Sequence, residues 1–208
     1  MDTTMILDSG NTAWIIVATL LVLLMTIPGI ALFYGGLVRQ KNVLSIIMQS
    51  LLIVGAVSIL WVAFGYSFVF GSSLMETDSV WRHFIGGFDK LFLQGITTSS
   101  LTTGRIPELM FVLFQCMFAV ITPALILGAF AERVKFAGFL MFTVLWSILV
   151  YIPMAHWVWG GGFLQQMGAI DFAGGTVVHI NAGIAALVMA ILIGKRRDYK
   201  IGHPMAPH

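Results

Sequence analysis

The sequence has little charge and almost no cysteine. Only 10% of its 208 residues are Asp, Glu, Lys or Arg, whereas 59% are hydrophobic, and the mean hydropathy is +0.96. This balance is typical of an integral membrane protein and excludes an ordinary soluble domain. The net charge of +2 gives no indication of nucleic-acid binding. The single cysteine, Cys116, excludes an internal disulfide framework, a cysteine zinc cluster and a CxxC redox pair.

Basic residues are also missing from the N-terminus. The first ten residues contain Asp2 and Asp8 but no Lys or Arg, which is unlike the start of a secretory signal. We therefore expect the first apolar segment to be retained.

Five apolar segments are each long enough to cross a bilayer as a helix, which needs about 20 residues. Their approximate ranges are 12–38, 43–70, 108–130, 136–154 and 172–194, with a long loop at about 71–107. The sequence thus predicts an all-α integral membrane protein whose ends lie on opposite sides of the membrane. Eight of the eleven basic residues fall on one side: Arg39, Lys41, Arg133, Lys135, Lys195, Arg196, Arg197 and Lys200. The positive-inside rule then places the N-terminus outside and the end at residue 208 in the cytoplasm.

Two of these segments contain notable groups of aromatic residues. Trp61 and Tyr66 lie near the outer end of the second segment, where we expect them to anchor the helix at the lipid headgroups. In the third segment Phe111, Phe114 and Phe118 recur at i, i+3 and i+7. Such a stripe packs in a core, or it forms stacked rings that close a path near the outer surface. The sequence alone leaves both interpretations open.

The outer connection after the fourth segment contains a second aromatic group. Trp157 and Trp159 flank Val158 just before three glycines, and His156 precedes them. Anchoring in the interfacial belt is the simplest role for both rings, and recognition of a cation by one of them is the alternative. We expect His156 to be an interfacial polar residue.

The head of the last segment carries the rarest residues for a membrane. Asp171 precedes a double glycine and is followed by His179, which lies well inside the hydrocarbon. A carboxylate at this position can accept the unpaired backbone N–H groups of the first helical turn, and it also favours a nearby cation. At 100° per residue the side of the helix around His179 carries small residues, whereas Val177 and Ile184 fall opposite, toward lipid. The imidazole is either satisfied by neighbouring helices or functional.

Four strings resemble those of the Amt/Mep/Rh ammonium transporters, on the Amt branch. They are DFAGGTVVHINAG from Asp171 to Gly183, IPMAHWVWGGG from Ile152 to Gly162, GAFAER from Gly128 to Arg133, and PGIALFYGGLVR from Pro28 to Arg39. The resemblance implies a homotrimer of eleven-helix protomers, each with a pore between two inverted five-helix repeats. Residues 1–208 are similar to the first repeat only, as a single membrane domain. We therefore expect the chain to be one half of a pore, which needs the second repeat to transport.

The resemblance also assigns roles to residues. In the family a tryptophan matching Trp159 belongs to the outer recruitment site for ammonium, and Phe118, with Phe114 one turn away, matches the stacked phenylalanine gate. His179 matches the first of two pore histidines, and Asp171 matches the structural acid at the outer mouth.

Near the other end of the pore, Phe33 and Tyr34 resemble residues that line its lower part. The second histidine and a hydroxyl side chain of the recruitment site belong to the second repeat. The resemblance therefore implies an ammonium transporter of the cell membrane that uses neither a cofactor nor a metal ion and is not an enzyme. It also suggests a cytosolic P-II regulatory protein as a partner at the inner face.

The implied mechanism separates ammonia from its proton. A bare ammonium ion in an apolar pore faces a penalty on the order of tens of kcal/mol. We expect NH4+ to bind Trp159, lose its proton and pass the phenylalanine gate as NH3, with His179 relaying the proton. One alternative is an ammonium sensor whose membrane module signals to an attached cytoplasmic domain, and another is an inactive half-transporter. An intramembrane hydrolase is disfavoured because no Ser, Cys or metal-ligand spacing partners His179.

Overall fold

The computed structural model describes residues 6–74, 78–196, 199 and 207–208, and these residues form helices, turns and loops with one isolated bridge between Leu101 and Pro107. Within them, five helical runs are long and apolar enough to cross a membrane, which confirms the predicted class. We number them as spans one to five: Ser9–Gly35, Gln40–Phe70, Glu108–Phe130, Phe136–Gln166 and Gly175–Ile193.

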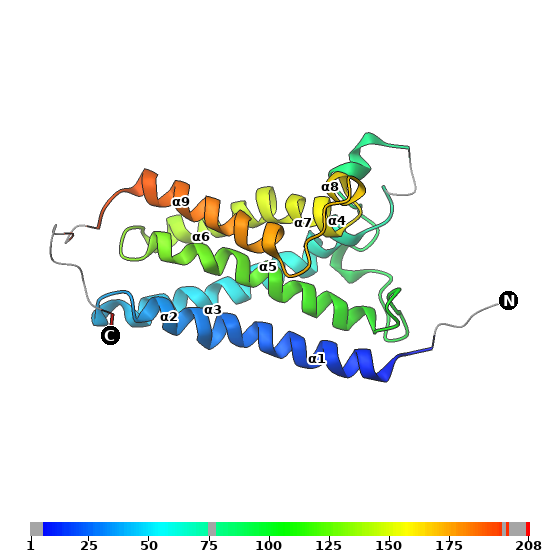
Figure 1. The fold of residues 1–208 in the computed structure, drawn as a ribbon, viewed down its shortest axis with the longest axis horizontal. Helices are drawn as coiled ribbons and strands as arrows, with labels where there is room; N and C mark the ends of the chain where they lie inside the picture. Colours follow the sequence, from blue (N-terminus) through cyan, green and yellow to red (C-terminus); the bar gives the residue numbers. More distant parts are fainter. Residues whose placement is uncertain (1–5, 75–77, 197–198, 200–206) are drawn as a thin grey trace.

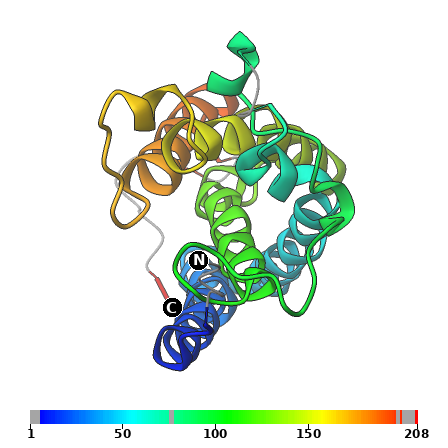
Figure 2. The same ribbon diagram turned by 90° about the vertical axis from the view of Figure 1, so that its right-hand side faces the viewer.

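The third span is the axis of the bundle. It consists of one helix, α5 (Glu108–Phe130), and in the end view of Figure 2 the other spans lie above it, to its right and below it. Small side chains let the neighbours approach closely, because Ala119 and Ala124 are almost fully buried. Cys116 is also buried, with its Sγ atom 3.5 Å from Ser58 Oγ.

Each of the other four spans contains a π-helical turn. Span one joins α1 (Ser9–Leu24) and α2 (Ala31–Gly35) through Met25–Ile30, where Pro28 follows a residue with extended backbone, Ile27 (φ −131°, ψ 112°). Span two joins α3 (Val43–Leu60) and α4 (Tyr66–Phe70) through Trp61–Gly65. Span four joins α6 (Phe136–Trp146) and α7 (Ile152–Trp159) through Ser147–Tyr151, and span five joins Gly175–Ile180 to α9 (Asn181–Ile193). Figure 1 shows these bent spans lying along α5.

Span four differs from its expected range. Its helix continues past residue 154 through α7, and a short helix α8 (Phe163–Gln166) follows, so the segment expected as an outer connection is mostly helical. Pro153 does not end the helix: it lies two residues after the π-helical turn Ser147–Tyr151, and a proline inside a membrane helix is tolerated where such local adjustments and neighbouring groups satisfy the freed backbone groups.

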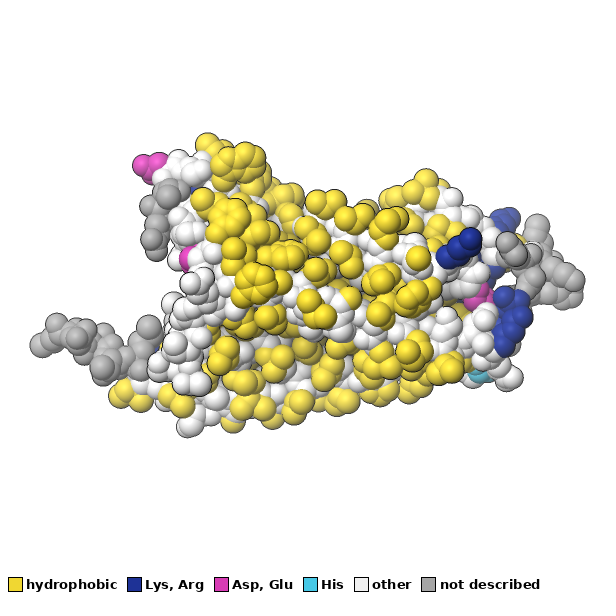
Figure 3. All heavy atoms as spheres, turned by 180° about the vertical axis from the view of Figure 1, so that it is seen from behind, with side chains coloured by type: hydrophobic (Ala, Val, Ile, Leu, Met, Phe, Trp, Pro, Cys, Tyr) yellow, Lys and Arg dark blue, Asp and Glu magenta, His cyan; other side chains and the backbone are white. Residues whose placement is uncertain are grey.

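The two ends of the bundle differ in character. We call the end that carries the segment 71–107 the loop end, and the opposite end, where Arg39, Arg133 and Lys195 lie, the basic end. In Figure 3, Lys and Arg side chains gather at the basic end, and a broad band of apolar side chains separates it from the loop end.

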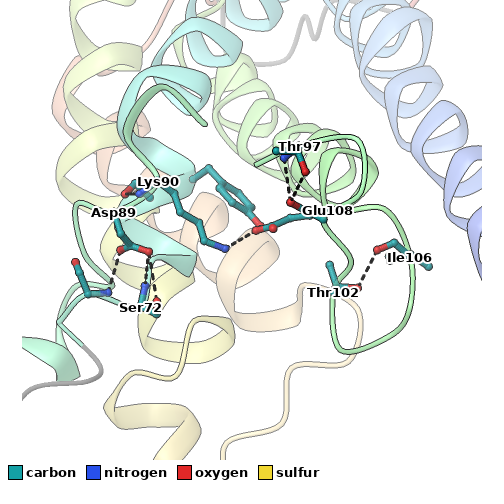
Figure 4. A network of polar contacts seen from close by, with 11 residues as sticks. Ser72, Asp89, Lys90, Thr97, Thr102, Ile106 and Glu108 are labelled. Atoms are coloured by element: carbon teal, nitrogen blue, oxygen red, sulfur yellow. Dashed lines mark hydrogen bonds and ion pairs between the residues drawn. The ribbon is translucent and has the colours of Figure 1, made fainter. Parts of the chain in front are cut away.

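The loop at the loop end packs onto the bundle. Ser67 Oγ donates to the carbonyl of Gly87 at 2.9 Å, and the backbone N–H of Gly86 donates to Phe68 at 2.7 Å. Asp89 accepts the backbone N–H groups of Ser72 and Ser73, and the Lys90 ammonium pairs with Glu108 at the start of α5 (Figure 4). The loop is therefore tied to spans two and three.

Trp61 and Tyr66 are not interfacial anchors, contrary to our prediction. Each is only 2% exposed and lies between α5 and the loop. Their polar tips find partners there: Trp61 Nε1 donates to the carbonyl of Val112 at 3.0 Å, and Tyr66 OH donates to Glu108 Oε1 at 3.0 Å. A buried indole or phenol needs such partners, and the third span supplies them in place of water at a membrane surface.

Candidate functional site

Asp171 caps the fifth span. Its Oδ1 atom accepts the backbone N–H of Gly175 at 2.7 Å, and Oδ2 accepts those of Thr176 and Val177 at 2.9 and 2.8 Å. The chain can turn back toward the carboxylate because Gly174 adopts a left-handed backbone (φ 75°) that suits glycine. Both carboxylate oxygens are therefore engaged by the first helical turn.

The same loop holds the indole of Trp159. Its Nε1 atom donates to the backbone carbonyl of Asp171 at 3.2 Å. The ring meets Phe118 edge-on, with centroids 5.8 Å apart, and Phe118 meets Phe114 at 4.9 Å with the two planes perpendicular. Three aromatic residues named from the sequence thus form one continuous contact.

These rings line a cavity of about 320 Å³ at the loop end. We call it the loop-end cavity; its walls are Phe70, Phe111, Phe114, Gln115, Phe118, Trp159, Asp171, Phe172, Ala173 and Gly174. All three members of the phenylalanine stripe therefore face this cavity; Phe114 and Phe118 also pack on each other, and Phe111 packs on Tyr66 and Phe70. Ring faces carry a partial negative charge, so such a wall suits a small cation.

His179 lines a second cavity, of about 140 Å³, next to the first. We call this the middle cavity, and Phe118 belongs to the walls of both. The Nδ1 atom of His179 lies 2.9 Å from the carbonyl oxygen of Gly174. A carbonyl can only accept, so Nδ1 carries the proton and Nε2 is the acceptor of the neutral ring.

One face of the fifth span near His179 has a different environment from the predicted one. Val177, expected to face lipid, is fully buried, whereas Ile184 is 58% exposed as expected. The turn Gly175–Ile180 is π-helical, so each residue rotates the chain by less than 100°, yet two such steps still leave Val177 roughly opposite His179. The side of the helix opposite His179 therefore packs against α5 and α7 at this level and does not face lipid.

Tyr34 lies at the basic end, beside a third cavity of about 240 Å³. Its hydroxyl donates to the carbonyl of Leu125 at 2.7 Å, and its ring packs on Gly128, where a Cβ atom would come within 2.6 Å of it. Leu125 lines both this basic-end cavity and the middle cavity. The ring centroids of Phe33 and Tyr34 lie 5.3 Å apart. Phe33 is 64% exposed, however, and lines none of the three cavities.

Two polar residues have central positions that sequence reasoning did not predict. His156 is fully buried, with its Nδ1 and Nε2 atoms 2.8 and 2.9 Å from the carbonyl oxygens of Val69 and Arg82, so it is not an interfacial residue. It ties α7 to span two and to the loop. In the sequence His156 lies near tryptophans and glycines, and nothing in this context distinguishes a buried histidine from an exposed one.

Glu132 is the second. Its side chain is 3% exposed and accepts from Arg39 Nε at 3.0 Å and from the side-chain amide of Asn42, while its other oxygen lies 3.3 Å from Arg196 Nη1. Burial raises the pKa of this carboxyl, but the hydrogen bonds from Asn42 and Arg39 outweigh burial and hold the pKa below its ordinary value. Glu132 thereby joins the connection between spans one and two to the ends of spans three and five at the basic end.

Comparison with known proteins agrees with the motifs. The model of the Ammonium Transporter Family matches residues 13–208. The chain belongs to this family. Its members are transporters and not enzymes.

The relatives are proteins more than twice as long as this chain. An ammonium transporter of Aquifex aeolicus is 50% identical over 193 residues, covering 92% of this chain and 44% of that protein. An ammonium transporter of Bacillus subtilis is 49% identical over 205 residues, covering 97% and 47%. In the crystal structure of Candida albicans Mep2, 42% of that chain is similar to 95% of this one, with a TM-score of 0.79 and 35% identity. The chain thus spans less than half the length of each.

Proposed function

We propose that this chain forms the first half of the substrate pathway of an ammonium transporter. The observation that carries the proposal is the position of Phe118, which lines both the cavity with Trp159 on its wall and the cavity with His179 on its wall. The names and identities of the relatives from Aquifex aeolicus and Bacillus subtilis support ammonium as the substrate.

In this mechanism NH4+ enters the loop-end cavity and binds against the Trp159 ring. Such a cation–π contact is worth about 0.5–2 kcal/mol, which concentrates the cation without trapping it. The Asp171 carboxylate shapes this wall and adds negative potential, although its oxygens are occupied by backbone N–H groups. The ion then transfers its proton to the relay that includes His179 and continues as NH3, because the charged ion would pay on the order of tens of kcal/mol to enter an apolar pore.

NH3 then passes Phe118 into the middle cavity. There the unprotonated Nε2 of His179 can accept a hydrogen bond from it, since Nδ1 is held by Gly174. With a second histidine from the missing repeat, His179 relays the proton, so that transport is electrogenic overall. NH3 leaves past Leu125 and Tyr34 through the basic-end cavity.

The arrangement of the whole protein belongs to the same proposal. Five spans with their basic residues at one end support a first inverted repeat in the cell membrane, with the N-terminus and loop end outside and the basic end in the cytoplasm. Membership of the family supports a homotrimer and a P-II regulatory protein that binds the basic end.

The proposal is tested by ammonium concentration jumps. The protein as its cell makes it is reconstituted into proteoliposomes on a solid-supported membrane, and the current is recorded after equal jumps of ammonium and potassium. We expect a transient inward current for ammonium, none for potassium and none in empty liposomes. A protein that responds equally to both cations, or to neither, would overturn the proposal.

A further inference from the structure

Gln115 carries a side-chain amide that the mechanism does not use. The residue follows Phe114 on α5 and its side chain lines the loop-end cavity. Its Oε1 atom is buried, and no described residue donates a hydrogen bond to it. Proteins rarely leave a buried amide oxygen unpaired, so this atom requires an explanation.

The other polar groups on the cavity wall are already occupied. Both oxygens of Asp171 accept backbone N–H groups, and the Trp159 N–H donates to the Asp171 carbonyl. Among the remaining described side chains of the wall there are only phenylalanine rings, an alanine methyl group and a glycine. The Gln115 amide is therefore the one uncommitted polar side chain of this wall.

The chemistry of an ammonium ion calls for such a group. All four of its N–H groups are hydrogen-bond donors. An aromatic ring face attracts the positive charge but is only a weak hydrogen-bond acceptor. An amide oxygen is a good neutral acceptor. The terminal torsion of glutamine is soft and roughly two-fold, and no described hydrogen bond holds Oε1 in place, so rotation can turn Oε1 into the cavity.

We propose that Gln115 is a specificity-determining residue of the loop-end cavity, whose amide oxygen accepts one N–H of the bound cation while Trp159 and Phe118 hold its charge. The inference rests on the proposed function and extends it. A contact made to the cation and not to the later species affects capture, so its loss raises the half-saturating concentration more than it lowers the maximal rate.

The test uses Gln115→Met, which keeps the side-chain volume and removes the acceptor. Ammonium-dependent currents of the reconstituted protein are recorded over a concentration series. We expect the half-saturating concentration to rise about tenfold, as for the loss of one hydrogen bond to a charged group, with the maximal current within about twofold. The matched control is Gln49→Met on α3, because Gln49 lines none of the three cavities and bonds locally to Ser45; it should leave both values unchanged.

A second variant, Gln115→Glu, keeps the geometry and adds charge. We expect its half-saturating concentration to fall below that of the wild type, with a smaller maximal current because the cation is released more slowly. An unchanged half-saturating concentration in Gln115→Met would overturn the inference while leaving the proposed function intact. A raised value in Gln115→Glu would also overturn it, because Gln115 would then serve packing alone. If the wild-type protein gave no ammonium current, both the proposed function and this inference would be overturned.

Discussion

The indole N–H of Trp159 donates to the backbone carbonyl of Asp171, 3.2 Å away, while the carboxylate of the same Asp171 caps the fifth span. One residue therefore fixes the ring at the loop end and the start of the helix that carries His179. Because the two functions share one loop, a change that loosens the cap should displace the ring as well.

Replacement of Asp171 tests this coupling. Asp171→Ala removes the acceptor of three backbone N–H groups and should destabilise the protein by about 2 kcal/mol, whereas Asp171→Asn keeps one oxygen and should lose less. The measurement is the apparent melting temperature of the purified protein in detergent. If Asp171→Ala melted at the wild-type temperature, the capping role would be wrong.

Glu132 should make stability depend on pH at the basic end. Its folded-state pKa lies below the ordinary value of about 4.3. The carboxylate therefore stabilises the fold in full above about pH 5, and this contribution is lost as the pH falls through the lowered pKa. At pH 7 we expect Glu132→Gln to cost about 1.5–3 kcal/mol, because a buried ionic acceptor is removed from Arg39 and Asn42.

The measurement is the melting temperature of wild type and Glu132→Gln from pH 7 down to pH 3. The difference between the two proteins should shrink as the pH falls from the ordinary carboxyl pKa through the lowered folded-state pKa of Glu132. A difference in melting temperature that stayed constant over this range would show that the charge on Glu132 does not contribute to stability.

Gly128 should tolerate no side chain. A Cβ atom there would lie 2.6 Å from the Tyr34 ring, so Gly128→Ala must move this ring and weaken its bond to Leu125. We expect a loss of about 1–3 kcal/mol by overpacking. The control is Gly55→Ala on α3, where an added Cβ meets nothing within 4 Å. Equal melting temperatures for the two variants would contradict the packing described for Tyr34.

The class of fold and much of the site could be predicted from the sequence. Long apolar runs specify membrane helices directly, because backbone polar groups in lipid must be satisfied within the helix. Asp171 was readable as a cap for a similar reason: its function depends on the next few residues of the chain. The contact among Phe114, Phe118 and Trp159 was suggested only by the resemblance of the sequence motifs to those of the ammonium transporters.

Features that depend on partners distant in the chain could not be predicted. Trp61 and Tyr66 resemble belt aromatics in sequence, and only the proximity of Val112 and Glu108 makes them buried residues. Glu132 is one acid among basic residues, and its importance arises from Arg196 and Asn42, which lie far along the chain. Val177 was assigned to lipid because the sequence shows that it lies opposite His179 but not that α5 and α7 cover this side.

The central claim is that His179 lies on the path of the substrate, and the most direct measurement is the ammonium current of His179→Ala in the reconstituted protein. His83→Ala is the matched control, because His83 lies in the loop and lines none of the three cavities. We predict that His179→Ala folds normally, with an elution profile and melting temperature close to the wild type, and loses most of its ammonium current, whereas His83→Ala keeps it. An undiminished current in correctly folded His179→Ala would contradict the account.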